Sequence, residues 1–502
     1  MLSRLPPPED QVHELSVLIE AHHPLLLIES IEDDRVHALI GHLADRMRMP
    51  LLMWSPTTGL VRQDTDTAGP APDTETPAKV LAFLETADRE ALYLLRDFPH
   101  ELDDPGMISR IKDIYRRYFR HRGALILTGP PRELPAELEP LFTPVRMAAP
   151  TPREYHRFIS AVLRDIGERR PVRIELDGEG VARLLEALGG LTFFEVRKII
   201  TQAVVEDGCL DEDDLSRVFE AKRRIVERSG VLEYFPHDRN LGDIAGLTQL
   251  KAWLSKRRLA FTQPEKARSF GLEPPRGLLL IGVQGCGKSL CAKAVAAEWS
   301  LPLLRLDPSN LYQKFFGESE RNLKRAIRTA EDMAPVVLWI DEIEKALGQD
   351  SNDGGTSQRV FGTFLSWLQE KKEEVFVIAT ANDISRLPPE LLRKGRFDEI
   401  FFVDLPGAEV RQRIFEVHLK KRERDPAQFD LSALADESVG FSGAEIEQAV
   451  VGGLYTAFSN GETLTTRHLL EELGGTHPMS QTMREKIDAL RAWAKDRAVP
   501  AG

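Results

Sequence analysis

Residues 282–289 carry the residue types that bind a triphosphate. They read Gly-Val-Gln-Gly-Cys-Gly-Lys-Ser and follow an apolar run, Gly277 to Ile281, that predicts a β-strand. Glycines at this spacing let backbone N–H groups converge on phosphate oxygens, while Lys288 places a positive charge beside the β- and γ-phosphates. The hydroxyl of Ser289 can bind Mg²⁺. The segment therefore predicts a P-loop, because the strand-like and helix-like flanks disfavour a simple Gly-rich turn.

Two carboxylates stand at the end of a second predicted strand. Val336 to Ile340 is apolar throughout, and Asp341 and Glu342 follow it directly. Their separation from Lys288 suits a Walker B element, in which Asp341 holds the hydrated Mg²⁺ while Glu342 orients and deprotonates the attacking water. A solvated acidic turn would explain the two carboxylates alone, but the P-loop in the same module favours the catalytic interpretation.

Polar residues also end a third predicted strand, Val375 to Thr380. Asn382 lies just beyond it, and its side-chain amide can help to place the attacking water. Thr380 is a second candidate for this sensor role. Taken alone, an Asn after a strand is more often a turn residue.

From residue 380 to residue 398 the sequence resembles the second region of homology of the AAA clade of AAA+ ATPases. The resemblance implies that Arg393 and Arg396 are arginine fingers, which reach the γ-phosphate bound by a neighbouring subunit. Catalysis would then require a homo-oligomeric ring, usually a hexamer in such families. The alternative is that these arginines cap a helix and pair with Asp398 or Glu399.

The same resemblance implies a set of nucleotide contacts and favours ATP over GTP. Residues 243–247 resemble the stretch that packs against the adenine, and residues 440–445 resemble the start of the lid helix. The expected contacts are Asp243, Ile244, Gly246, Gly282, Gly285, Cys286, Gly287, Lys288, Ser289, Leu290, Gly443 and Ala444.

Residues 314–320 resemble the loop that lines the ring pore in protein-threading members. There Phe315 would grip a polypeptide, with Phe316 and Gly317 completing the loop. The competing interpretation is that both phenylalanines pack under a helix capped by Ser319.

Within residues 232–502, the resemblance is detailed in segments 250–257, 287–290, 338–340, 361–371 and 392–402. These segments are similar to one narrower family, the bacterial and plastid-encoded AAA proteins named after hypothetical chloroplast open reading frame forty-six. The similarity is looser over the first half of the chain. In photosynthetic organisms the family is linked to regulation of photosynthesis and inorganic carbon use, which no residue in this sequence can indicate.

The fold class expected is α/β: an AAA+ P-loop module with a parallel sheet and helical lid, preceded by a degenerate AAA-like α/β plus helical module. The expected domains are 1–150 (α/β without a P-loop), 151–230 (helical subdomain and linker), 231–405 (AAA+ large subdomain), 406–475 (lid) and 476–502 (last helix). In the first module the P-loop position, residues 29–36, has no Gly-x-x-x-x-Gly-Lys, and we expect no ATP binding there. An unrelated α/β adaptor is the alternative.

The net charge of -13 argues against general attraction to nucleic acid, and three cysteines without a Cys-x-x-Cys pair favour a reducing compartment. Neither a leader nor a stretch long enough to cross a bilayer is recognisable, so we expect a cytoplasmic protein without membrane contact. Residues 112–122 are basic and aromatic, which suits a nucleic-acid patch but more often marks an amphipathic helix.

These features predict an ATP-hydrolysing ring, with ATP and Mg²⁺ as cofactors, that remodels a protein client. A nucleotide-gated scaffold is the second hypothesis. A nucleic-acid remodeller acting through residues 112–122 is the third.

Overall fold

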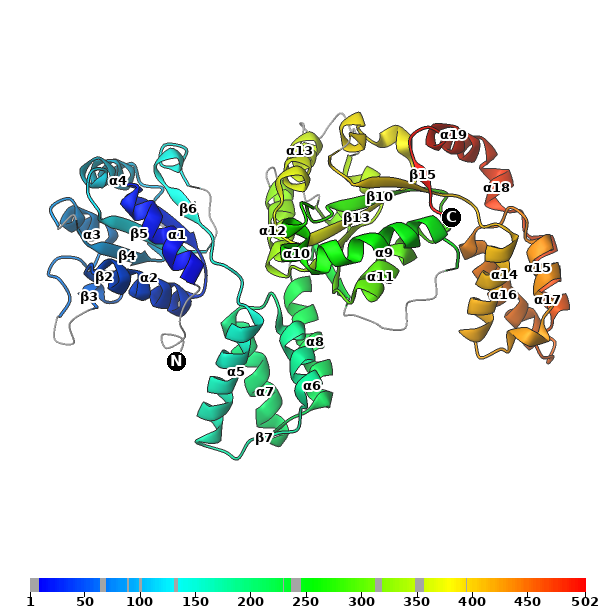
Figure 1. The fold of residues 1–502 in the computed structure, drawn as a ribbon, viewed down its shortest axis with the longest axis horizontal. Helices are drawn as coiled ribbons and strands as arrows, with labels where there is room; N and C mark the ends of the chain where they lie inside the picture. The colour runs from blue at the N-terminus through cyan, green and yellow to red at the C-terminus, as the bar shows by residue number, and fades with distance from the viewer. Residues whose placement is uncertain are drawn as a thin grey trace. The chain divides into compact units, whose positions relative to one another are not determined.

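The computed structural model describes residues 9–63, 69–87, 90–98, 102–130, 134–228, 230–235, 245–311, 318–347, 356–393 and 395–502. The chain forms two compact units, residues 1–218 and 219–502. Each unit contains a mainly parallel sheet covered by helices and a further helical segment (Figure 1). The boundary between the units falls inside α8 (Glu212–Glu227), whereas the sequence analysis placed a domain boundary after residue 230. The domain ranges expected from the sequence remain predictions.

The N-terminal unit begins with an α/β layer and continues into helices. Its layer contains α1 (Glu9–Glu20), β1 (Leu25–Glu29), α2 (Asp33–Met47), β2 (Leu51–Ser55), β3 (Gly59–Arg62), α3 (Pro77–Leu84), β4 (Leu92–Arg96), α4 (Pro105–Tyr118), β5 (Ala124–Gly129) and β6 (Thr143–Val145). The helical part contains α5 (Pro152–Gly167), β7 (Arg173–Ile174), α6 (Gly178–Leu188), α7 (Phe193–Asp207), β8 (Cys209–Leu210) and α8.

The second unit has the same plan. Its large part contains β9 (Leu232–Phe235), α9 (Thr248–Thr262), α10 (Pro264–Ser269), β10 (Gly277–Gly282), α11 (Lys288–Trp299), β11 (Leu303–Leu306), α12 (Glu318–Asp332), β12 (Val336–Ile340), α13 (Thr356–Glu370), β13 (Val375–Ala381) and β14 (Glu399–Val403). The lid contains α14 (Ala408–Lys420), α15 (Leu431–Glu437), α16 (Gly443–Ser459) and α17 (Thr466–Gly475). The last elements are α18 (Met479–Thr482), α19 (Arg484–Ala494) and β15 (Val499–Pro500).

The strands of the second sheet are apolar runs because helices cover both of its faces. Side chains alternate along β10: Leu278 and Leu280 join a buried cluster with α9 and α11. Leu279 and Ile281 join a cluster with α12 and α13 on the other face. Parallel pairing of β10 with β13 and of β13 with β12 brings the carboxyl ends of these three strands to one edge. That edge holds the P-loop and both carboxylates.

The two sheets share the order of five parallel strands, whereas their antiparallel edge strands differ, since β3 follows β2 along the chain and β9 precedes β10. The N-terminal sheet runs β6-β1-β5-β4-β2-β3, and the second runs β14-β10-β13-β12-β11-β9 with β15 added beside β14. In each sheet the strand beyond β2 or β11 is antiparallel to its neighbour. This shared order agrees with the expected second AAA-like module and disfavours the alternative of an unrelated α/β adaptor.

A short sequence repeat also relates the two units. The sequence analysis overlooked this repeat. Residues 190–195 read Gly-Leu-Thr-Phe-Phe-Glu and residues 440–445 read Gly-Phe-Ser-Gly-Ala-Glu. Gly190 and Gly440 both have left-handed backbone, with φ of 80° and 85°. Each segment then opens a helix, α7 or α16, with a capping box that joins the Thr or Ser to the Glu.

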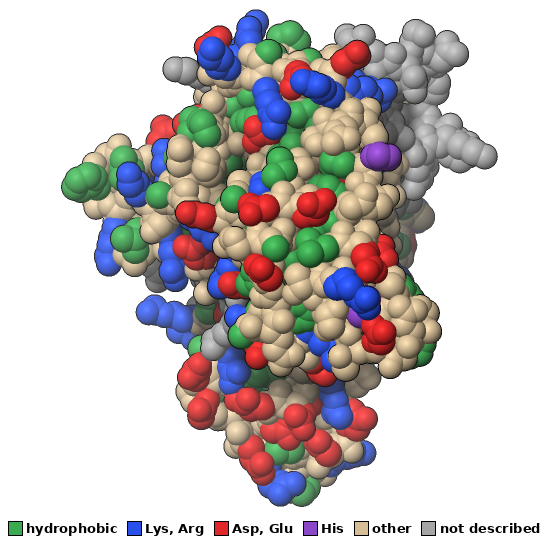
Figure 2. Space-filling view, turned by 90° about the vertical axis from the view of Figure 1, so that its right-hand side faces the viewer, with side chains coloured by type: hydrophobic (Ala, Val, Ile, Leu, Met, Phe, Trp, Pro, Cys, Tyr) green, Lys and Arg blue, Asp and Glu red, His purple; other side chains and the backbone are tan. Residues whose placement is uncertain are grey.

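The basic segment 112–122 behaves as part of an amphipathic helix. In α4, Tyr118 is fully buried, while Phe119 just beyond is about half exposed. Lys112 contacts Glu137, and Arg116 contacts Asp113 at 2.9 Å, so acidic neighbours offset part of the positive charge. Figure 2 draws another face of the chain, on which acidic and basic side chains are interspersed. Within the described residues, no helix has the length and apolar character needed to cross a bilayer.

Candidate active site

The P-loop joins β10 to α11 through a turn that requires glycine. Gly285 and Gly287 have φ of 76° and 91°, a region that residues with side chains rarely adopt. A β-carbon at Gly282 would collide with the carbonyl oxygen of Val403 on the adjacent strand β14. The spacing of the glycines thus reflects backbone geometry as well as ligand access.

Lys288, the first residue of α11, is held within the P-loop. It is only 6% exposed, and its Nζ donates hydrogen bonds to the carbonyl oxygens of Gly282 and Val283, both at 2.8 Å. Burial lowers the pKa of Lys288 to about 8, although carboxylates including Glu344 oppose the shift. These partners are neutral carbonyl groups, so a phosphate would offer the ammonium a stronger, charge-assisted bond.

Asp341 is contacted by residues of two neighbouring strands, β11 and β13, and of α11. Its Oδ1 accepts hydrogen bonds from the hydroxyls of Thr380 at 2.8 Å and Ser289 at 3.4 Å. Its Oδ2 accepts a hydrogen bond from Nη2 of Arg305 on β11 at 3.1 Å, and Nη1 of Arg305 donates to Glu233 on β9 at 3.1 Å. Ser289 and Asp341 thus offer adjacent oxygen donors, the ligand type that Mg²⁺ prefers.

Glu342 is held by Thr380 on β13, by Asn382 just after β13 and by Lys345. It adopts left-handed backbone, φ 51°, which is uncommon for a residue with a side chain and recurs at functional sites. Its N–H donates to the Thr380 hydroxyl at 3.0 Å, and its Oε1 accepts a hydrogen bond from Nδ2 of Asn382 at 2.8 Å. Lys345 contacts the other oxygen, Oε2. The two residues expected to handle the attacking water are therefore in direct contact.

Glu344 is a buried carboxylate that the sequence analysis did not single out. Its Oε1 accepts the backbone N–H of Asn382 at 2.8 Å, and its Oε2 has no hydrogen-bond partner among the described residues. Burial raises the pKa of Glu344. The carboxylate fixes the backbone that carries the Asn382 amide. Its position two residues after Glu342 was the only signal available in the sequence.

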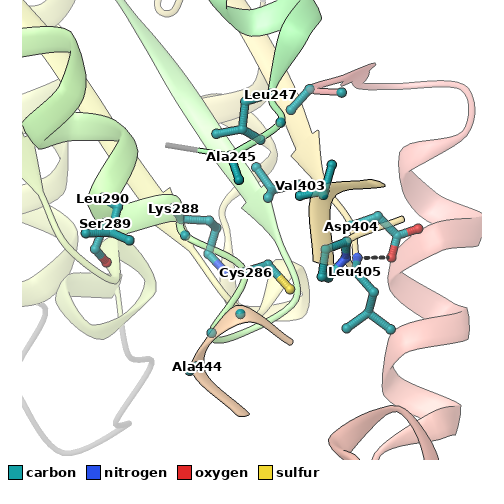
Figure 3. Close-up of a pocket in the computed structure, with 18 of the residues that line it drawn as sticks. Ala245, Leu247, Cys286, Lys288, Ser289, Leu290, Val403, Asp404, Leu405 and Ala444 are labelled. Carbon is teal, nitrogen blue, oxygen red and sulfur yellow. Dashed lines mark hydrogen bonds between the residues drawn. The ribbon is translucent and has the colours of Figure 1, made fainter. Parts of the chain in front are cut away.

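A cavity of about 730 Å³ opens at this edge of the sheet, a size typical of nucleotide-sized ligands. The residues that form its walls belong to six short segments: 245–247, 284–290, 341–342, 402–407, 443–447 and 500–502. Thr380, Asn382 and α14 complete it. Figure 3 shows Lys288 and Ser289 on one side of the cavity, with Asp404 and Leu405 on the other.

The lid helix α16 begins against the P-loop. The Ala444 N–H donates to the carbonyl oxygen of Gly285 at 3.1 Å. A β-carbon at Gly443 would lie 3.3 Å from the same oxygen, so a small residue suits this position. Gly443, Ala444, Gly246 and residues 285–290 all line the cavity, and their contacts with a nucleotide remain predictions.

His418 on α14 also lines the cavity and was missed from the sequence, where it stood alone in a helical pattern. Its Nδ1 lies 3.4 Å from both Glu447 and Nη1 of Arg422. Burial lowers the pKa of His418, although Glu447 opposes the shift. The ring is therefore neutral near neutral pH.

The two expected finger residues lie outside the cavity lining of their own chain. Arg393 is exposed, and Arg396 is partly buried with no hydrogen-bond partner for Nη1 among the described residues. Asp398, considered as their partner, instead accepts the backbone N–H groups of Arg276 and Gly277 at 2.6 and 2.8 Å. The finger role remains a prediction.

Other predictions fall on residues outside the described ranges. These are the adenine-side contacts Asp243 and Ile244 and the pore-loop residues Phe315, Phe316 and Gly317.

The N-terminal unit carries different chemistry at the corresponding edge of its sheet. After β1, where the second unit has its P-loop, Glu32 Oε1 accepts the N–H of Phe193 at the start of α7 at 2.7 Å. Arg35 lies 3.3 Å from the other Glu32 oxygen, and both side chains are about 9% exposed. At the end of β4, Arg96 contacts Asp33 at 2.6 Å. A carboxylate and an arginine thus stand near the positions where the second unit has its P-loop and Asp341.

Two AAA families match three separate parts of the chain. Residues 278–405 match the ATPase family associated with various cellular activities (AAA). Residues 11–147 match the N-terminal domain of the SpoVK-like AAA ATPases, and residues 154–229 match the second domain of that family. The chain is therefore a nucleotide-binding P-loop hydrolase, an ATPase whose first half also has AAA relatives.

Similarity to individual proteins extends over nearly the whole chain. The AAA domain-containing protein ycf46 of Pyropia yezoensis is 36% identical over 489 residues, 96% of this chain and 97% of that protein. The ycf46 protein of Trieres chinensis is 36% identical, covering 96% of both chains. The proteasome-activating nucleotidase of Aeropyrum pernix is 35% identical over 265 residues, 49% of this chain and 64% of that protein. This chain belongs to the ycf46 family of AAA domain-containing ATPases.

Proposed function

We propose that the second unit hydrolyses ATP bound with Mg²⁺ in the cavity between the P-loop and the lid. The observation that carries this proposal is the direct contact of Asn382 with Glu342, close to the Ser289 and Asp341 oxygens, in a cavity of about 730 Å³. Backbone N–H groups of the P-loop and the Lys288 ammonium would hold the phosphates.

The metal fits the donor set. Ser289 and Asp341 would hold Mg²⁺, which when bound offsets negative charge on the phosphates. Glu342 then accepts a proton from the attacking water, and Asn382 holds the carboxylate in position through its 2.8 Å hydrogen bond. Arg305 holds Oδ2 of Asp341, so that Oδ1 stays directed toward Ser289.

Hydrolysis would be completed by a second copy of the chain. AAA+ ATPases generally assemble, and Arg393 and Arg396 lie outside the cavity lining of their own chain. We infer that both reach the γ-phosphate of a neighbouring subunit, where such cations contribute roughly 10³ to 10⁵ in rate. A head-to-tail contact of this kind closes into a ring, for which we propose a hexamer.

The substrate proposed is a protein. Similarity to proteasome-activating nucleotidases over about half of this chain supports protein remodelling, with Phe315 as the candidate gripping residue. Three free cysteines, Cys209, Cys286 and Cys291, fit a reducing compartment such as the cytoplasm.

The N-terminal unit would serve as a scaffold or partner-binding module without nucleotide. Glu32 would place negative charge where phosphates bind in the second unit, and it already occupies the N–H group that opens α7. A phosphate there would meet repulsion instead of converging donors.

Capture of bound proteins by the Glu342→Gln form in ATP tests this function. Slow hydrolysis should prolong the client complex, so proteins should be recovered with this form and not with Lys288→Ala. Phe315→Ala in the same background should release them while leaving the assembly intact. Equal recovery from all three forms would contradict protein remodelling.

A further inference from the structure

The last described segment of the chain returns to the nucleotide cavity. After the lid, residues 479–502 cross back to the large part of the second unit, and Pro500, Ala501 and Gly502 line the cavity. They do so beside Ala245, Gly246 and Leu247. Figure 3 shows the end of this segment beside Leu247. We call residues 499–502 the tail.

Backbone pairing holds the tail in place. β15 pairs in parallel with β14, and the Ala501 N–H donates to the Phe402 carbonyl oxygen at 2.9 Å. The Ala501 carbonyl oxygen accepts the N–H groups of Gln249 and Leu250 in the first turn of α9, both at 3.1 Å. These two N–H groups would otherwise lack a partner at the helix start. Ala501 is 1% exposed, so the tail is packed like an interior strand.

Two further contacts tie the preceding residues to the rim of the cavity. Arg491 on α19 makes a two-pronged contact with the Asp404 carboxylate, with Nε and Nη2 each 2.9 Å from an oxygen. The Met479 N–H donates to Glu445 of the lid capping box at 2.7 Å. Residues 479–502 therefore contact the lid, Asp404 between β14 and α14, and the first turn of α9.

The surface that the tail offers at Pro500 and Ala501 is apolar. The Ala501 carbonyl and N–H are both paired, and the Pro500 ring and Ala501 lie near Leu247, Val403 and Leu405 around the cavity. Such a wall suits the flat face of a purine better than a phosphate, since it supplies packing surface and no positive charge.

We propose that the tail is the wall against which the nucleobase packs, so that it is needed for binding a nucleotide but not for binding a phosphate chain alone. This inference rests on the proposed function, namely that the cavity binds ATP with its base toward residues 245–247. The wall provides packing and no free donor or acceptor at Ala501. Removal of the tail should therefore weaken the binding of ATP and of GTP by a similar factor.

The test is isothermal titration of the full chain and of a form ending at residue 498, each with ADP and with inorganic tripolyphosphate. The shortened form should bind ADP about tenfold more weakly, the factor expected when roughly 50 Å² of apolar contact is lost. Its tripolyphosphate affinity should be unchanged. Arg497→Ala is the matched control, because Arg497 lies just before the tail and contacts Trp493 instead of the cavity.

Unchanged ADP affinity in the shortened form would overturn the inference, as would equal losses for ADP and tripolyphosphate. Failure of the unaltered chain to bind either ligand would instead contradict the proposed function. If the shortened form does not fold, hydrogen exchange of the unaltered chain decides. The Gln249, Leu250 and Ala501 amides should be more protected with ADP than with tripolyphosphate, and equal protection would overturn the inference.

Discussion

Nδ2 of Asn382 donates a hydrogen bond to Oε1 of Glu342 at 2.8 Å, joining the ends of β12 and β13 at the cavity. The contact holds the carboxylate in one orientation, while the left-handed backbone of Glu342 sets the direction in which the side chain leaves the strand. The pair therefore behaves as one unit for positioning and deprotonating water.

Glu342→Gln should abolish most turnover while nucleotide still binds. The amide keeps the size of the side chain but cannot accept a proton, so kcat should fall by roughly 10² to 10⁴. Steady-state ATPase assays and ADP titration measure the two effects. A variant that turns over ATP at an unchanged rate would exclude Glu342 as the base.

Asn382→Ala should lower kcat by a smaller factor with little change in KM. Glu342 would keep its proton-accepting oxygen but lose one of the contacts that orient it. Asn382→Asp is the informative companion, because a second carboxylate would repel Glu342 and lower kcat further. Equal kcat in the unaltered protein and Asn382→Ala would contradict the positioning role.

Arg305→Met should raise the Mg²⁺ concentration needed for half-maximal activity and for tight ADP binding. Without Arg305, Asp341 loses the 3.1 Å contact that holds Oδ2, and Oδ1 is free to turn away from Ser289. Titrating Mg²⁺ against ADP affinity provides a readout independent of turnover. Arg305→Lys retains the charge, so its Mg²⁺ requirement should lie between those of the unaltered chain and Arg305→Met. If Arg305→Met has the same Mg²⁺ requirement as the unaltered chain, Arg305 does not have this role.

Acid should destabilise the lid through His418. Because its folded-state pKa is lowered by burial, the unfolded chain takes up the proton first as pH falls below about 6.5. The stability associated with neutral His418 is present above that pH and is lost progressively below it. Melting temperatures measured from pH 8 to pH 5 should fall less steeply for His418→Gln, which cannot be charged, and parallel curves would contradict this account.

Glu32→Ala should destabilise the N-terminal unit and leave nucleotide binding unchanged. The substitution leaves the Phe193 N–H without its hydrogen-bond acceptor and removes the partner of Arg35. The free energy of unfolding should fall by about 1–3 kcal/mol. Chemical denaturation measures the loss, and ADP titration provides the control. Unchanged stability would contradict the structural role of Glu32, and a second ADP-binding site in the unaltered chain would contradict our proposal that the N-terminal unit binds no nucleotide.

Much of the fold was predictable because buried parallel strands appear as uninterrupted apolar runs. Val336–Ile340 was located from this signal alone, and Val375–Thr380 was located to within one residue of the end of β13. The contact of Arg305 with Asp341 was not predictable, because it depends on the pairing of β11 with β12, which brings together residues far apart in sequence. The return of Ala501 to the cavity depends likewise on long-range pairing with β14.

Only part of the relation between the two units could be inferred from the sequence. Their shared alternation of α/β and helical segments was clear, but the repeat around Gly190 and Gly440 retains few identical residues. What it conserves is physical: a left-handed glycine, then a capping hydroxyl and a glutamate that start a helix. The shared order of five strands depends on long-range backbone pairing, which the residue types alone do not specify.

Mixing two inactive forms tests the central claim most directly. Lys288→Ala lacks the ammonium that holds phosphate, and the double variant Arg393→Ala, Arg396→Ala lacks the cations that we assign to the neighbouring site. We predict that each form alone has under about a hundredth of normal activity, given the 10³ to 10⁵ contribution of such cations. Mixed assemblies should recover turnover at interfaces that combine an intact P-loop with intact arginines. No recovery at any mixing ratio, or full activity of the double variant alone, would contradict a site shared between subunits.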